Sequence, residues 1–92
     1  MDIRGVVREF IRSNFYVGDG VGDEESLLDT GILDSTGVLE VVAFLETQFG
    51  IALADGEIVP ENLETIARMS AFVERRLEAI SERGGGVLRS VS

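Results

Sequence analysis

The chain has 92 residues, of which 45% are hydrophobic, and this length and composition predict one folded domain with a modest core. With neither Cys nor His, it can form no disulfide, no cysteine-ligated metal site and no imidazole-based catalytic site. The net charge of −9 argues against nucleic acid as a partner, because basic side chains are needed to neutralise phosphates. No apolar run reaches membrane-spanning length and the first residues lack a signal-peptide pattern, so we expect a cytoplasmic monomer that binds no membrane.

Residues 2–16 are predicted to form an amphipathic helix, because their apolar residues recur at helical spacing. The predicted buried face comprises Ile3, Val6, Val7, Phe10 and Ile11. Three arginines spaced four residues apart, Arg4, Arg8 and Arg12, form a basic stripe beside that face. We interpret the stripe as a solvated helix surface whose charges pair with acids of the neighbouring loop.

Residues 17–34 follow as a loop rich in Gly and Asp. The loop is long for a connection without structure of its own, so its apolar residues are expected to pack on the core. These residues are Leu27, Leu28, Ile32 and Leu33. The acids of the loop, Asp19, Asp23, Glu24 and Glu25, would repel a phosphate and do not have the spacing of an EF-hand. We therefore expect neither a phosphate site nor a metal site in this loop.

A second helix is predicted over residues 35–49, because apolar residues recur at helical spacing and Gly50 supplies a stop signal. Its core face comprises Val38, Val41, Val42, Leu45 and Phe49. The remaining surface carries a small apolar and acidic patch that runs down the helix from Ser35. The candidate partner-docking residues in this patch are Thr36, Leu39, Glu40, Ala43 and Glu46.

The start of this second helix is the candidate functional position. Asp34 is a predicted N-cap, which places Ser35 at the first helical position with its hydroxyl in solvent. The positive end of the helix dipole lies there, so a phosphate ester on that oxygen would be well placed. The same residues are also ordinary helix-start chemistry, and the local pattern leaves capping without any function open.

A second loop ends at Pro60. The residues after it are predicted to form a short helix over residues 61–67 and a final helix over residues 68–80. The apolar face of the final helix comprises Met69, Phe72, Val73, Leu77 and Ile80. Three glycines at 84–86 are expected to end the helix, so that residues 1–83 form the domain and residues 84–92 a flexible tail. No stretch alternates long enough to predict a strand, which implies an all-α bundle of three longer helices and one short helix.

Two segments together resemble a known family. "LLDTGILDSTGVLEVVAFLETQFGI", followed by "IVPENLETIARMSAFVERRL", is similar to the acyl carrier and peptidyl carrier proteins over residues 3–82. The "LDS" triplet is similar in particular to freestanding D-alanyl and aminoacyl carriers. The resemblance implies a four-helix fold in which Ser35 receives phosphopantetheine covalently from coenzyme A. The thiol of that arm then holds an acyl or aminoacyl group as a thioester.

The resemblance also implies a protein that is not itself an enzyme. Its expected partners are a phosphopantetheinyl transferase, an adenylate-forming ligase or other loading enzyme, and a downstream acyltransferase, condensing or tailoring enzyme. Specialised metabolite biosynthesis is the expected setting, with an amino acid or small acyl unit as cargo.

Three residues of the second helix depart from the family pattern. Thr36 stands where most relatives have a bulky apolar residue, and Gly37 and Thr47 stand where fatty-acid carriers have acids. Docking is therefore expected to use Leu39 and Ala43 more than charge. The alternative is a small acidic helical interaction module without a covalent arm.

Overall fold

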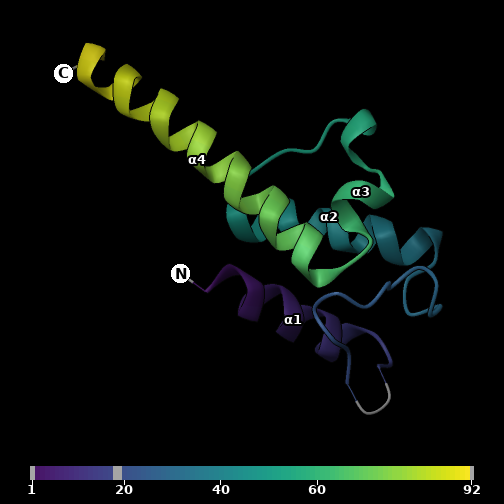
Figure 1. Ribbon diagram of the computed structural model, residues 1–92. Helices are drawn as coiled ribbons and strands as arrows, with labels where there is room; N and C mark the ends of the chain where they lie inside the picture. Colours follow the sequence, from purple (N-terminus) through teal and green to yellow (C-terminus); the bar gives the residue numbers. More distant parts are fainter. Residues whose placement is uncertain (1, 18–19, 92) are drawn as a thin grey trace.

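The computed structural model describes residues 2–17 and 20–91, with side chains described as far as residue 81. Within these residues the chain is helical and contains no strand, as expected for an all-α bundle with one short helix (Figure 1). The elements in chain order are α1 (Ile3–Asn14), α2 (Ser35–Phe49), the 3₁₀ turn η1 (Asp55–Glu57), α3 (Pro60–Leu63) and α4 (Ile66–Val91). None of the described helices is long and apolar enough to cross a membrane.

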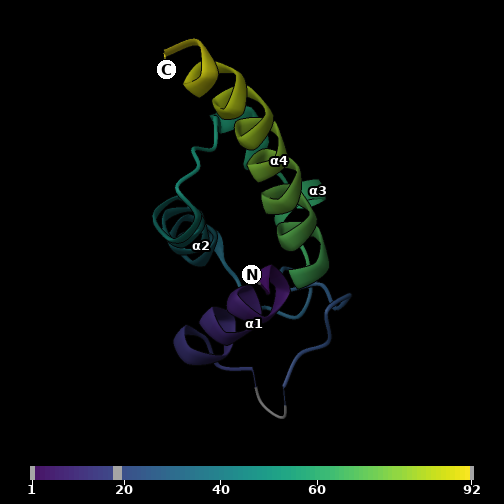
Figure 2. The same cartoon turned by 90° about the vertical axis from the view of Figure 1, so that its left-hand side faces the viewer.

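The core lies where α1, α2 and α3 pack against the first half of α4 (Figures 1 and 2). Both views show the last turns of α4 extending beyond the other helices. The side chains with the least exposed surface come from all parts of the bundle. They include Val7, Ile11, Leu27, Val41, Leu45, Ile66, Met69 and Val73. Burial of such apolar surface is the main favourable term in the stability of the fold.

Helix α1 ends two residues before the expected boundary at residue 16. It begins after Asp2, whose side chain accepts a hydrogen bond from the Gly5 amide at 3.1 Å. Phe15 adopts an extended backbone (φ −135°, ψ 151°), which ends the helix. Its ring lies against the start of α2, where a Cβ added to Gly37 would be 3.1 Å away from it. This contact between elements explains the earlier end, because continued helix would carry the ring elsewhere.

The loop after α1 is well packed, as its apolar residues predicted. Leu27 is fully buried and Leu33 is nearly so, while Leu28 and Ile32 are half-buried. The Leu27 amide donates to the Glu64 carbonyl at 2.8 Å, and the Asp23 carbonyl accepts from the Ala67 amide at 2.9 Å. The loop is thereby joined to the junction between α3 and α4. Asp19, one of its predicted acids, lies outside the described residues.

The arginine stripe of α1 helps to hold this loop. Arg4 and Arg8 both pair with the Asp23 carboxylate, at 3.1 Å in the case of Arg4. The hydrogen bond from Arg8, with the charges of Arg8 and Arg4, lowers the pKa of Asp23 below its ordinary value against the opposing effect of burial. The same hydrogen bond raises the pKa of Arg8. The third arginine, Arg12, pairs instead with Glu9 of its own helix.

Protonating Asp23 is expected to weaken the fold in acid. Because its pKa is lower in the folded than in the unfolded chain, the stabilisation is present above about pH 4 and disappears as the pH falls through the lowered value. Asp23→Asn should therefore be less stable than the wild type at pH 6, with the difference shrinking as the pH falls through the lowered pKa of Asp23. Urea unfolding of both proteins across this range measures it. A difference that persists unchanged in strong acid would assign the effect to packing.

Helix α4 is longer than expected at both ends. The Thr65 hydroxyl accepts from the Arg68 amide at 3.0 Å and so caps the helix, which starts at Ile66 instead of residue 68. The short helix α3 starts with Pro60 at its first position and ends at Leu63. At the other end α4 runs through the glycines at 84–86 to Val91, so the expectation that they end it was wrong. Extending an existing helix gains one hydrogen bond per residue, and no proline opposes it here. Mobility of residues 84–92 stays a prediction, and Ser92 lies outside the described residues.

Candidate functional site

The start of α2 presents Ser35 to solvent. Asp34 has an extended backbone, and its Oδ1 accepts a hydrogen bond from the Gly37 amide at 2.7 Å. The Asp34 carbonyl accepts from the Val38 amide at 2.9 Å, which begins the helical ladder. Asp34 is therefore the N-cap, as predicted, and Ser35 is the first helical residue with an exposed side chain. The Ser35 hydroxyl is not needed for the cap, so it is available for chemistry.

The cap makes a direct prediction for Asp34. Asp34→Ala is expected to lower the free energy of unfolding by about 1 kcal/mol, because the Gly37 amide loses its acceptor. Asp34→Asn keeps an oxygen at that position and should lose much less. Chemical denaturation of the three proteins measures the difference. Equal losses in Asn and Ala would mean that the negative charge, and not the hydrogen bond, stabilises this end of α2.

Gly37 is buried, although it is the third residue of an otherwise exposed helix start. A Cβ at this position would lie 3.1 Å from the Phe15 ring and 3.2 Å from the Leu33 side chain. An acid at residue 37 would therefore point into this packing and not toward a partner. The absence of an acid there has a steric reason in this chain.

A groove of about 390 Å³ lies directly beside Ser35. One wall is the start of α2, and the other is the segment that runs into α3 together with Leu28 of the first loop. Apart from Ser35 the lining is apolar: Leu28, Val38, Leu39, Ile58, Val59, Pro60 and Leu63. Sequence reasoning selected Ser35 and Leu39 but missed the 58–63 wall. The available signal was the apolar pair Ile58 and Val59 directly before the only proline, since a short connection there leaves apolar side chains at the surface.

The structure brings most of the predicted docking residues to one exposed surface. Leu39 is 61% exposed and lines the groove next to Ser35, which supports the predicted helical register. Thr36, Glu40 and Ala43 are also exposed. Glu46 differs, because it is half-buried and its Oε2 accepts a hydrogen bond from the Leu53 amide at 2.9 Å. Glu46 thus holds the following loop and is less available to a partner than predicted.

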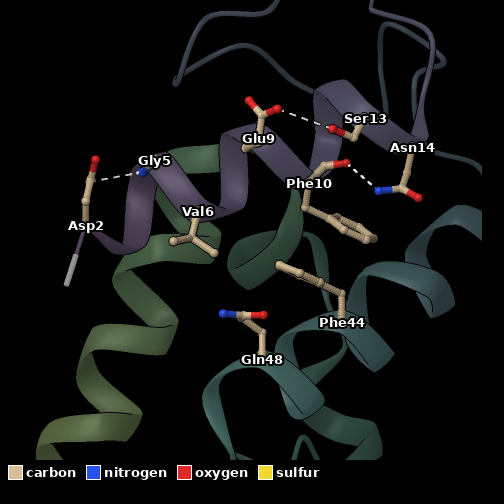
Figure 3. Close-up of a pocket in the computed structure, with 9 residues that line it drawn as sticks. All are labelled: Asp2, Gly5, Val6, Glu9, Phe10, Ser13, Asn14, Phe44 and Gln48. Carbon is tan, nitrogen blue, oxygen red and sulfur yellow. Dashed lines mark hydrogen bonds between the residues drawn. The ribbon is translucent and has the colours of Figure 1, made fainter.

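A second, larger groove of about 610 Å³ lies between α1 and α2 and does not include Ser35 (Figure 3). Its floor is the pair Phe10 and Phe44, whose rings stack with centroids 3.9 Å apart. Glu9 on its rim accepts from Ser13, and Asn14 donates to the Phe10 carbonyl, so these polar groups are already used within α1. This groove therefore offers apolar packing between two helices but no group with evident chemistry.

Comparison with known proteins supports one interpretation of the Ser35 site. The family model described as "Phosphopantetheine attachment site" matches residues 5–73. The chain is 38% identical over 55 residues to a D-alanyl carrier protein of Abiotrophia defectiva, covering 60% of this chain and 70% of that protein. It is 34% identical over 67 residues to the probable acyl carrier protein PigG of Serratia sp., covering 73% and 76%. It is 32% identical over 75 residues to aminoacyl carrier protein 2 of Bradyrhizobium diazoefficiens, covering 82% of each.

The residues around the start of α2 fit a phosphopantetheine arm. An exposed hydroxyl is available for a phosphate ester, and the amino end of a 15-residue helix favours the negative charge of that ester. The apolar groove beside it can cover the methyl and methylene groups of the pantetheine. With the family model matching most of its length, this chain belongs to the phosphopantetheine-binding carrier proteins, which hold acyl or aminoacyl groups on a covalently attached arm.

Proposed function

We propose that the arm is attached to Ser35. The observation that carries this assignment is an exposed hydroxyl at the start of α2 that opens onto the apolar groove and is not used by the helix cap. The Ser35 oxygen forms a bond to the phosphorus that bears the pantetheine in coenzyme A. The bond from that phosphorus to the rest of the nucleotide breaks, adenosine 3′,5′-bisphosphate leaves, and the serine proton passes to a base of the transferase.

Intact mass spectrometry tests the attachment directly. The purified chain is incubated with coenzyme A, magnesium and a broad-specificity phosphopantetheinyl transferase. A carrier gains the mass of one phosphopantetheine, and peptide mapping should place it on the segment that contains Ser35. The rival, an acidic interaction module without an arm, predicts no gain of mass under the same conditions.

We further propose that the chain is not itself an enzyme and that its partners do the chemistry. These are a phosphopantetheinyl transferase, an adenylate-forming ligase or other loading enzyme, and an acyltransferase, condensing or tailoring enzyme that unloads the arm. The thiol of the arm supplies the reactive group, and the protein supplies position and recognition. A cytoplasmic location stays a prediction.

The proposed cargo is an amino acid or a small acyl unit in specialised metabolism. The relatives named as D-alanyl, acyl and aminoacyl carriers support this range. Loading assays with a panel of adenylate-forming ligases, read by intact mass, would identify the group. Efficient elongation of a long fatty chain on this carrier would refute the proposal.

The proposed docking surface consists of Thr36, Leu39, Glu40 and Ala43. Its exposed apolar centre with an acidic rim is suited to a transient interface, in which the apolar part supplies affinity and the charges supply association rate. Leu39→Ala is expected to raise the KM of the loading enzyme for the carrier with little change in kcat, by about tenfold for a side chain central to the interface. Steady-state kinetics with varied carrier concentration measure it.

The contribution of the acidic rim can be recognised in the same assay by its dependence on salt. Glu40→Arg should slow association most at low salt, and the defect should shrink as ionic strength rises and screens the charges. Glu78→Arg, which makes the same charge change at an exposed residue of α4 outside the proposed surface, is the control and should slow association much less. If Leu39→Ala lowers the melting temperature strongly and leaves partner kinetics intact, the docking surface lies elsewhere.

A further inference from the structure

The groove wall that faces Ser35 has little apolar packing of its own. It consists of residues 58–60 and the buried Leu63 of α3, a helix of four residues. Ile58 and Val59 are only half-buried, and Pro60 is exposed. Leu53 and Leu63 are buried in the core, but all residues between them are exposed or half-buried, so this stretch needs polar contacts to keep one position.

Those contacts come from Arg76 on α4. Its Nη1 donates to the Ala52 carbonyl at 2.5 Å, and its Nη2 donates to Oε2 of Glu57. The guanidinium carbon also lies 5.0 Å from the centre of the Phe72 ring, within the range of a cation–π contact. Glu57 uses its other oxygen, Oε1, to accept from the Ala54 amide at 2.9 Å. One arginine therefore holds both ends of the segment that leads into the groove wall.

The pair between Arg76 and Glu57 is better placed than an ordinary surface ion pair. The two side chains are 26% and 34% exposed, and the guanidinium fork makes two hydrogen bonds to different parts of the segment. An exposed pair would contribute little because water and salt screen it. Asn62 of α3 adds a hydrogen bond to the Glu57 carbonyl at 2.9 Å, which extends the connection into the wall itself.

We propose that Arg76 is a positioning residue for the phosphopantetheine arm. Leu53 is already buried and hydrogen-bonded to Glu46, so the part that Arg76 fixes is residues 54–57, and through them the 58–60 wall against which the arm rests beside Ser35. This inference rests on the proposed attachment at Ser35. Without the arginine, residues 54–60 can move between the buried Leu53 and Leu63, the groove loses a fixed wall, and the arm spends less time against it.

The first test uses the protein before the arm is attached. Arg76→Met removes both hydrogen bonds and keeps the length of the side-chain stem. Arg75→Met is the matched control, because Arg75 is the exposed neighbour and its loss changes the net charge equally. Hydrogen exchange of the Ala54 and Glu57 amides, which are bonded inside the segment, should become about tenfold faster in Arg76→Met only. The Val38 amide in α2 should exchange as in the wild type.

The second test uses the protein with its arm. Attachment is expected to shift the NMR signals of the Val38 and Leu63 methyl groups, which line opposite walls of the groove. In Arg76→Met these shifts should shrink toward zero, whereas in Arg75→Met they should equal those of the wild type. Glu57→Gln, which weakens the same contact more gently, should give a smaller change in the same direction. Melting curves confirm that each variant is folded.

Each result decides a different step. Equal exchange rates in Arg76→Met and Arg75→Met would show that Arg76 does not hold the segment. Faster exchange with unchanged methyl shifts would show that the segment does not set the groove. Either result overturns the inference. A wild-type chain that gains no mass would refute the attachment itself, and the positioning of an arm with it, whatever the exchange rates show.

Discussion

Ser35→Ala is expected to abolish the gain of mass with coenzyme A and transferase, because Ser35 carries the hydroxyl that opens onto the apolar groove at the start of α2. The substitution should leave the fold intact. Ser35 is exposed, and the helix cap is made by Asp34. Replacing such a surface residue typically changes the free energy of unfolding by less than about 0.5 kcal/mol. Intact mass and a melting curve on the same sample measure both expectations.

Thr36→Ala is the matched control for this substitution. Thr36 is the adjacent exposed hydroxyl residue on α2, so its variant should still gain one arm at the end of the reaction if only Ser35 is used, whatever the substitution does to the docking of the transferase. Should Ser35→Ala still be modified while Thr36→Ala is not, the attachment point is Thr36. The family assignment would stand in that case, since it does not depend on which hydroxyl is used.

Leu27→Ala is expected to be the most destabilising of the substitutions considered. Leu27 is fully buried although it lies in a loop, and its truncation leaves a cavity in the core. Truncating a buried leucine to alanine costs about 2–5 kcal/mol. In a domain of this size that loss lowers the melting temperature by more than about 10 °C. Thermal and urea unfolding measure it.

Leu39→Ala is the internal standard for that measurement. It makes the same chemical change at a side chain that is 61% exposed, so little buried apolar surface is lost and the free energy of unfolding should change little. A small effect at residue 39 and a large one at residue 27 would show that the first loop is part of the core. If the two variants melted alike, the loop would be loosely attached in solution.

Local signals predicted α2 accurately because its boundaries are set by residues next to them in sequence. Asp34 caps the start, and Gly50, in the left-handed conformation with φ of 66°, ends the helix. The end of α1 was predicted less well, since it depends on where Phe15 meets Gly37. The far end of α4 was missed because glycines lower helix propensity without forbidding a helix that has already formed.

The residues of the candidate site likewise differ in whether the sequence could predict them. Ser35 and Leu39 could be predicted because helical spacing alone places them side by side on α2. The opposite wall at residues 58–63 and its attachment through Arg76 could not, since both depend on how α3 and α4 fold back. Glu46 shows the limit most clearly. Helical spacing placed Glu46 near the surface patch, but its carboxylate accepts a hydrogen bond from the Leu53 amide in the loop that follows α2.

The hydrogen bonds that join the first loop to the α3–α4 junction also set an order of events during synthesis. The Asp23 carbonyl and the Leu27 amide find their partners only at Ala67 and Glu64, roughly 40 residues later in the chain. Closing such a segment costs entropy that local helix formation does not, so it belongs to the late steps of folding. The groove likewise needs Leu63. During synthesis on the ribosome, Ser35 is therefore made well before the residues that form the groove around it. The complete site first exists when α4 has emerged from the ribosome.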